Sequence, residues 1–200
     1  LSFAMGLRHL QKAFHLKEIR ILFICVFLFS FGWSFFYEFI PVTWIAKYDF
    51  QASTIGLLYG YASAFYALSS GLLIRPVVSR FKPSQILFYA LALGGGYILF
   101  LLCNLGSLSL WFYLPPLQFF IALLFPTATT LISNEANQKM QGEILGVLQS
   151  VQSTAFGLSP LLSGSFLGLS QNMPALVGGL AFLCAALILG ISLRQKIFHP

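Results

Sequence analysis

Apolar residues occur in six long runs along the chain, and polar residues are distributed unevenly among these runs. Each run has about 20 residues, the length that an α-helix rising about 1.5 Å per residue needs to cross about 30 Å of hydrocarbon. The pattern predicts six membrane-spanning helices near residues 21–46, 54–74, 85–103, 109–132, 143–168 and 174–193. Residues 1–20 are left as a linker or interfacial segment, and residues 194–200 as a short tail.

Polar side chains are concentrated in the first, second, fourth and fifth runs, whereas the third and sixth runs are almost entirely apolar. Lipid penalises hydroxyl, amide and carboxylate groups without partners, so these groups gather where helices face one another or water. Along the six runs, the order polar, polar, apolar occurs twice, which indicates two three-helix repeats. We therefore expect an all-α integral membrane six-helix bundle in which two helices of each repeat line an aqueous space and one faces lipid.

Charge predicts the orientation of this bundle. The chain has a formal net charge of +6, and ten of its eleven cations fall in the two terminal segments and in the loops at 75–84 and 133–142. With six spans these four segments lie on one side, which the positive-inside rule makes cytoplasmic. Both termini are then cytoplasmic, in a membrane such as the bacterial inner membrane. The cations form no nucleic-acid patch.

Composition argues against an enzyme. Charged residues make up 8% of the chain and apolar residues 58%, which excludes an ordinary soluble domain. The cysteines and histidines are scattered, without CxxC or HExxH spacing: Cys25, Cys103, Cys184, His9, His15 and His199. The expected loops are too short for a soluble catalytic domain. The sequence predicts no metal, no cofactor and no catalytic residues.

The first two spans carry polar and aromatic residues at helical spacing. The candidates for lining a cavity here are Trp33, Ser34, Tyr37, Glu38, Tyr59, Ser63 and Tyr66. The aromatic members would form a wall for a flat or cationic substrate. Trp44 and Trp111 are expected nearer the outer boundary, within an aromatic belt.

The fourth and fifth spans add amides. Pro115, Pro116 and Pro126 predict that the fourth helix is broken, which membranes tolerate only where protein or water satisfies the freed backbone groups. Gln118 and Gln152 each lie about 15 Å from an end of their spans, a depth that Ser63 shares, so the three are expected to meet near the midplane. Gln149 faces the same way as Gln152. The alternative role for these residues is hydrogen bonding between helices.

Glu38 is the only acid well inside a span. A charge at the bilayer centre costs about 2.5–3.5 kcal/mol on insertion scales, which favours either a functional role, cavity-lining or proton-linked, or a neutral, protonated form. However, Glu38 lies about 27 Å along a straight helix from Arg20, so an interfacial position is the alternative.

Two motifs carry a family resemblance. Gln141-Gly142-x3-Gly146-x3-Ser150-x6-Gly157-x-Ser159-Pro160-x3-Gly164 resembles the eleventh helix of major facilitator superfamily transporters, and is most similar to the tetracycline and multidrug proton antiporters, with Ser-Pro in place of Gly-Pro. Gly71-x8-Arg80-Phe81-Lys82 resembles the second copy of the family's cytoplasmic loop motif, although its acidic and second glycine positions are absent.

The resemblance covers all 200 residues as the C-terminal six helices of a usually twelve-helix protein. It implies a secondary transporter that works by alternating access, with proton-coupled efflux of a small, drug-like molecule as the first hypothesis, and a missing N-terminal six-helix half as partner. It also implies a cytoplasmic gate, for which Arg80 and Glu135 form the candidate pair. An importer of a sugar, amino acid or osmolyte, and a non-transporting subunit or decayed half-transporter, are the alternatives.

Overall fold

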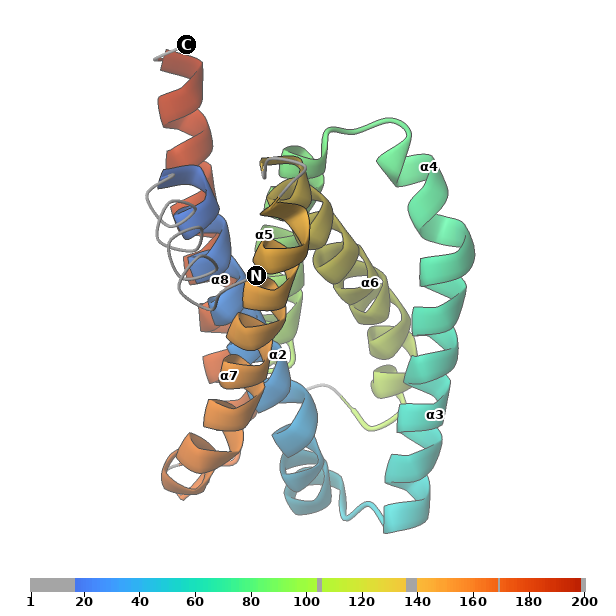
Figure 1. Ribbon diagram of the computed structural model, residues 1–200. Coiled ribbons are helices and arrows are strands. Elements are labelled where there is room, and N and C mark those ends of the chain that lie inside the picture. The colour runs from blue at the N-terminus through green and yellow to red at the C-terminus, as the bar shows by residue number, and fades with distance from the viewer. Residues whose placement is uncertain (1–16, 104–105, 136–139, 169, 199–200) are drawn as a thin grey trace.

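A computed structural model describes residues 17–103, 106–135, 140–168 and 170–198, and the regular elements of this part of the chain are all helices joined by short loops (Figure 1). The elements are α2 (Lys17–Tyr48), α3 (Ala52–Leu68), the π-helix η1 (Ser69–Leu73), α4 (Ile74–Val78), α5 (Pro83–Phe100), α6 (Ser109–Glu135), α7 (Gln141–Leu167) and α8 (Met173–Phe198). Each of the six expected spans falls on one of these helices or, for the second span, on α3, η1 and α4 together. The all-helical bundle predicted from the sequence is confirmed.

Five membrane segments in the described residues are long and apolar enough to cross a bilayer: α2, α3 with its continuation to Val78, α5, α6 and α8. The remaining long helix, α7, has 27 residues but includes three glutamines and several serines and glycines. These residues lower its mean hydropathy without shortening it. The chain is therefore an integral, multi-pass membrane protein whose most polar long helix is α7.

The predicted break in the fourth span is wrong, because α6 is one continuous helix from Ser109 to Glu135. Proline at positions 115 and 116 removes the amide donors that would bond to the carbonyls of Trp111 and Phe112. Both carbonyls belong to the first turn of α6. Membrane helices tolerate such prolines when neighbouring groups or water satisfy the freed carbonyls.

The second span is interrupted where the sequence predicted a single helix. The π-helical turn Ser69–Leu73 separates α3 from α4. Pro76 cannot donate to the Leu72 carbonyl one turn earlier, and Gly71 contributes no side-chain packing, so the regular i→i−4 ladder is weakest here. The π-helical turn changes the direction of α4 relative to α3. Helix α6 contacts α3, η1 and α4.

Helix α8 lies between α2 and α5 and packs closely on both through consecutive glycines. A Cβ at Gly178 would lie 2.9 Å from the Gly32 carbonyl oxygen of α2, and a Cβ at Gly179 would lie 3.0 Å from the Gly95 carbonyl oxygen of α5. Small residues permit this approach of helix backbones in membranes. The glycine contacts hold α2, α8 and α5 together as one layer.

Aromatic packing fills the centre of the bundle. Phe29 of α2 makes edge-to-face contacts with Phe125 of α6 at 5.2 Å and with Phe182 of α8 at 6.3 Å between ring centroids. Phe29 and Phe182 are completely buried. Because these rings join three helices, the core fixes the relative position of α2, which carries the candidate residues Trp33, Ser34, Tyr37 and Glu38.

The exposed helix faces are of two kinds. On α5 and α8 the exposed large residues are apolar or aromatic, namely Tyr89, Leu93, Phe100, Leu180, Leu187 and Ile191. On α3 and α7 the exposed positions combine large apolar residues such as Leu57 and Leu161 with small and polar residues, namely Gly56, Gly60, Ser63, Gly146, Gln149, Ser150 and Ser153. Figure 1 shows α3 and α7 on opposite flanks of the bundle, and they are not packed on each other. The apolar faces suit contact with lipid.

Candidate functional site

A carboxylate and several aromatic rings meet where α2 contacts α3. We call Trp33, Ser34, Tyr37, Glu38, Tyr59 and Ser63 the Glu38 cluster. The first four lie on consecutive turns of one stripe of α2, and the last two lie four residues apart on α3. Helical spacing alone brings the members on each helix together, whereas the contact between the helices depends on packing.

Hydrogen bonds hold the Glu38 cluster in register. The Ser34 hydroxyl donates to Oε1 of Glu38 at 2.8 Å, and Ser34 is buried while Glu38 is exposed. The Tyr59 hydroxyl donates to the Tyr37 carbonyl, and the Ser63 and Tyr37 side chains lie within hydrogen-bonding reach of each other. Glu38 is close enough to Tyr59 for the two to interact electrostatically.

Ring stacking gives the cluster a rigid aromatic wall. Trp33 stacks on Tyr37 with centroids 4.7 Å apart, and Tyr37 meets the edge of Tyr59 at the same distance. Aromatic faces carry negative electrostatic potential and attract cations. A carboxylate beside such faces can bind a proton or a cationic group.

Trp44 belongs beside this wall, although the sequence pattern assigned it to an outer aromatic belt. Its side chain is buried, its ring lies 6.1 Å from that of Tyr59, and its indole N–H has no hydrogen-bond partner among the described residues. The spacing Tyr37, Pro41, Trp44 continues the stripe of α2 and could have placed it correctly. Trp111, the other expected belt residue, packs against Tyr61 at 5.0 Å.

The three residues expected to meet at the midplane have different environments. Gln118 is buried on α6 and its amide nitrogen has no hydrogen-bond partner in the described part of the chain, so it is not bonded to Gln152 or Ser63. Ser63 is exposed on α3, Gln152 is half-buried on α7, and Gln149 is exposed. Tyr66, also exposed, lies two turns from Tyr59 on α3. A shared cavity for these residues stays a prediction.

The expected cytoplasmic gate residues are both exposed. Arg80 lies in the turn after α4, and Glu135 is the last residue of α6. No ion pair joins Arg80 to Glu135 in the ranges that the structure describes. Glu135 instead borders a small pocket with Ser84 and Ser192. A gate pair of these residues stays a prediction.

The site can now be compared with known proteins. A family model described as Major Facilitator Superfamily matches residues 4–160, which is most of the chain and includes the Glu38 cluster. The chain belongs to the major facilitator superfamily. No curated protein and no solved structure matches it. Major facilitator proteins are transporters, so this membrane-embedded chain is a major facilitator transporter that contacts lipid and a small-molecule substrate.

Family membership agrees with the chemistry of the site. Within the described residues no group of three or more His, Cys, Asp or Glu side chains is placed to hold a metal ion. The Glu38 cluster offers one carboxylate, four hydroxyls and three aromatic rings, which suit reversible recognition of a small molecule. The major facilitator fold thus explains why polar residues gather on particular helix faces of an apolar protein.

Proposed function

We propose that this chain forms the C-terminal half of a proton-coupled major facilitator exporter that moves small, drug-like molecules by alternating access. The observation that supports the proposal most directly is the Glu38 cluster, in which a hydrogen-bonded carboxylate adjoins the ring pair Trp33 and Tyr37. Proton binding and release at Glu38 would switch the charge beside an aromatic surface that favours flat or cationic cargo.

The depth of Glu38 supports a role in coupling rather than at the membrane surface. Helix α2 has 32 residues and is about 48 Å long at about 1.5 Å per residue. A hydrocarbon core of about 30 Å centred on this helix would place Glu38 about 8 Å from the midplane. The carboxylate would then lie inside the membrane, where an ionisable group is retained for function.

The partner in this proposal is an N-terminal six-helix half that docks on α3 and α7. An added Cβ at Gly56, Gly60, Gly146 or Gly157 would meet nothing within 4 Å. Small residues on unpacked helix faces allow close approach of another helix in lipid. The substrate path would run between the halves, past the Glu38 cluster and Gln118, Gln149 and Gln152, with both termini and the loop at Arg80 on the cytoplasmic side of a bacterial inner membrane.

Cysteine accessibility tests the proposed aqueous path. In a background where the three native cysteines are replaced, Ser63→Cys and Gln152→Cys are expected to react with charged, hydrophilic thiol reagents in membranes. Leu93→Cys and Leu187→Cys, on the apolar faces of α5 and α8, are matched controls that should stay unlabelled. Labelling of the two leucine positions with protection of Ser63 and Gln152 would contradict the transporter path.

Proton coupling and cargo are tested by flux. The protein in its native membrane, prepared as inverted vesicles with an imposed pH gradient, is expected to accumulate aromatic cations and to collapse the gradient when they are added. Sugars, amino acids and osmolytes should leave the gradient unchanged. A response to a sugar, amino acid or osmolyte instead would favour a metabolite transporter and reject the drug-like cargo.

A charge exchange tests the proposed cytoplasmic gate. Arg80→Glu and Glu135→Arg are each expected to lower transport strongly, because two like charges would then face each other in the closed gate. The double variant restores the opposite charges in exchanged positions and should recover most of the activity. Flux in the same vesicles measures all three proteins. Failure of the double variant to recover would argue against direct pairing.

A further inference from the structure

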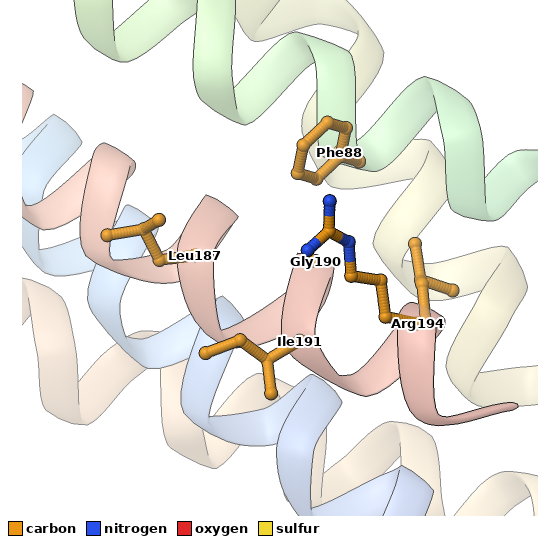
Figure 2. A pocket seen from close by; sticks show the side chains of 6 residues that line it. Phe88, Leu187, Gly190, Ile191 and Arg194 are labelled. Carbon is orange, nitrogen blue, oxygen red and sulfur yellow. The ribbon is translucent and has the colours of Figure 1, made fainter. Parts of the chain in front are cut away.

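A groove on the exposed side of α5 and α8 is separate from the Glu38 cluster. Its volume is about 460 Å³, and its lining comprises Phe88, Leu187, Gly190, Ile191, Leu193 and Arg194 (Figure 2). The side of α8 that meets α2 is different, since the thiol of Cys25 on α2 donates to the carbonyl of Ala185. The groove therefore lies on the apolar side of the bundle, away from the proposed substrate path.

Glycine forms the floor of this groove. A Cβ at Gly190 would lie 2.9 Å from Cε2 of Phe88, so the ring of α5 rests almost directly on the backbone of α8. Leu187 and Ile191 flank Gly190 and are 66% and 59% exposed, which leaves their side chains open to the surroundings. In a membrane protein these surroundings are lipid acyl chains.

Arg194 places a positive charge at one end of the apolar groove. Figure 2 shows its side chain turned back along α8, over Gly190 and toward Phe88, the direction in which helical side chains point. None of the other five lining residues is acidic, so the groove itself supplies no counter-charge to Arg194. An anion would stabilise a guanidinium beside hydrocarbon, and its fork of donors matches phosphate with two parallel hydrogen bonds.

We propose that this groove binds an anionic phospholipid, with the phosphate on Arg194 and an acyl chain along Ile191 and Leu187. Seven residues separate Arg194 from Leu187, about 10 Å along the helix, which suits the upper part of an acyl chain. Arg194 lies at the end of the bundle that carries Arg80 and Lys82, where anionic lipids concentrate near basic segments. A headgroup contact and a chain contact on one helix together distinguish a lipid from a free anion.

Lipid binding by the purified full chain tests the site. Native mass spectrometry with phosphatidylglycerol and phosphatidylcholine of equal chain length should show preferential retention of phosphatidylglycerol. Arg194→Gln is expected to weaken phosphatidylglycerol binding about tenfold or more and phosphatidylcholine binding clearly less, because the choline cation of phosphatidylcholine offsets the charge of its phosphate. Arg75→Gln, which removes an exposed arginine of α4, is the matched control and should have no effect.

Further variants separate the headgroup from the chain. Arg194→Lys keeps the charge but loses the two-pronged contact and should fall between the wild type and Arg194→Gln. Ile191→Gln places an amide against the acyl chain and should weaken both lipids. Equal affinity of the wild-type protein for the two lipids, or an equal loss in Arg75→Gln, would overturn the proposal. Displacement of bound phosphatidylglycerol by millimolar inorganic phosphate would also overturn it, because a free anion would then suffice.

Discussion

Gly95→Leu is expected to destabilise the folded bundle by about 3 kcal/mol or more, because an enlarged side chain in a closely packed contact cannot be accommodated without moving a helix. A Cβ at this position would already lie 2.8 Å from Cβ of Phe182 and 3.1 Å from the Gly179 carbonyl oxygen. Neither atom is the free end of a flexible side chain. The variant should therefore separate α5 from α8 and lower the midpoint of thermal unfolding in detergent.

The neighbouring glycine provides the control. Gly96 is exposed, and a Cβ there would meet nothing within 4 Å. Gly96→Leu adds the same side chain to the same helix and should change the free energy of unfolding by no more than about 0.5 kcal/mol. Equal unfolding midpoints for the two variants would show that the glycine contact between α5 and α8 is absent from the folded protein.

Glu38→Gln is expected to reduce proton-driven transport by the intact protein to background while expression stays normal. Glutamine has nearly the same shape as glutamate, and its amide oxygen can still accept the hydrogen bond that Ser34 donates to Oε1. It cannot take up or release a proton. Because Glu38 is exposed, the substitution should alter the free energy of unfolding by less than about 0.5 kcal/mol.

Two measurements separate coupling from binding in this variant. Exchange of substrate across the membrane without a pH gradient should persist, since it requires the site but no net proton movement. Asp49→Asn is the matched control. Asp49 has a φ of 54°, a conformation that asparagine also adopts readily, and it lies beyond the end of α2. Undiminished pH-dependent flux in Glu38→Gln would remove Glu38 from the mechanism and leave the proposed proton coupling without its carboxylate.

The elements that sequence patterns located best are those determined by local chemistry. A run of about 20 apolar residues forms a membrane helix because each unsatisfied backbone group in lipid costs several kcal/mol. The stripe from Trp33 to Glu38 follows from helical periodicity alone, and α2 carries it on one side as expected. The interruption of the second span was harder to predict from the sequence, because the effect of Pro76 on the preceding turn depends on how the chain relaxes around it.

The errors have a common cause, which is that side-chain environments depend on contacts between distant segments. Prolines 115, 116 and 126 suggested a broken helix, yet α6 is continuous. Trp44 resembled a belt residue and is buried against Tyr59. Gly32 carries no recognisable signal of its own, since its importance arises from Gly178, which lies far away in the sequence.

The order of apolar and polar residues by itself determined that this chain is a helical membrane protein of two three-helix repeats, because hydrocarbon imposes the same length and backbone bonding on every span. Only the tertiary structure decided which polar groups meet. It joined Tyr59 and Ser63 of α3 to the Glu38 stripe and opened a groove beside Arg194. It also buried Gln118, whose amide nitrogen has no hydrogen-bond partner among the residues that the structure describes. In lipid, a polar group costs free energy unless it has a hydrogen-bond partner, and any suitable partner will do. The sequence therefore requires such contacts without specifying between which helices they form.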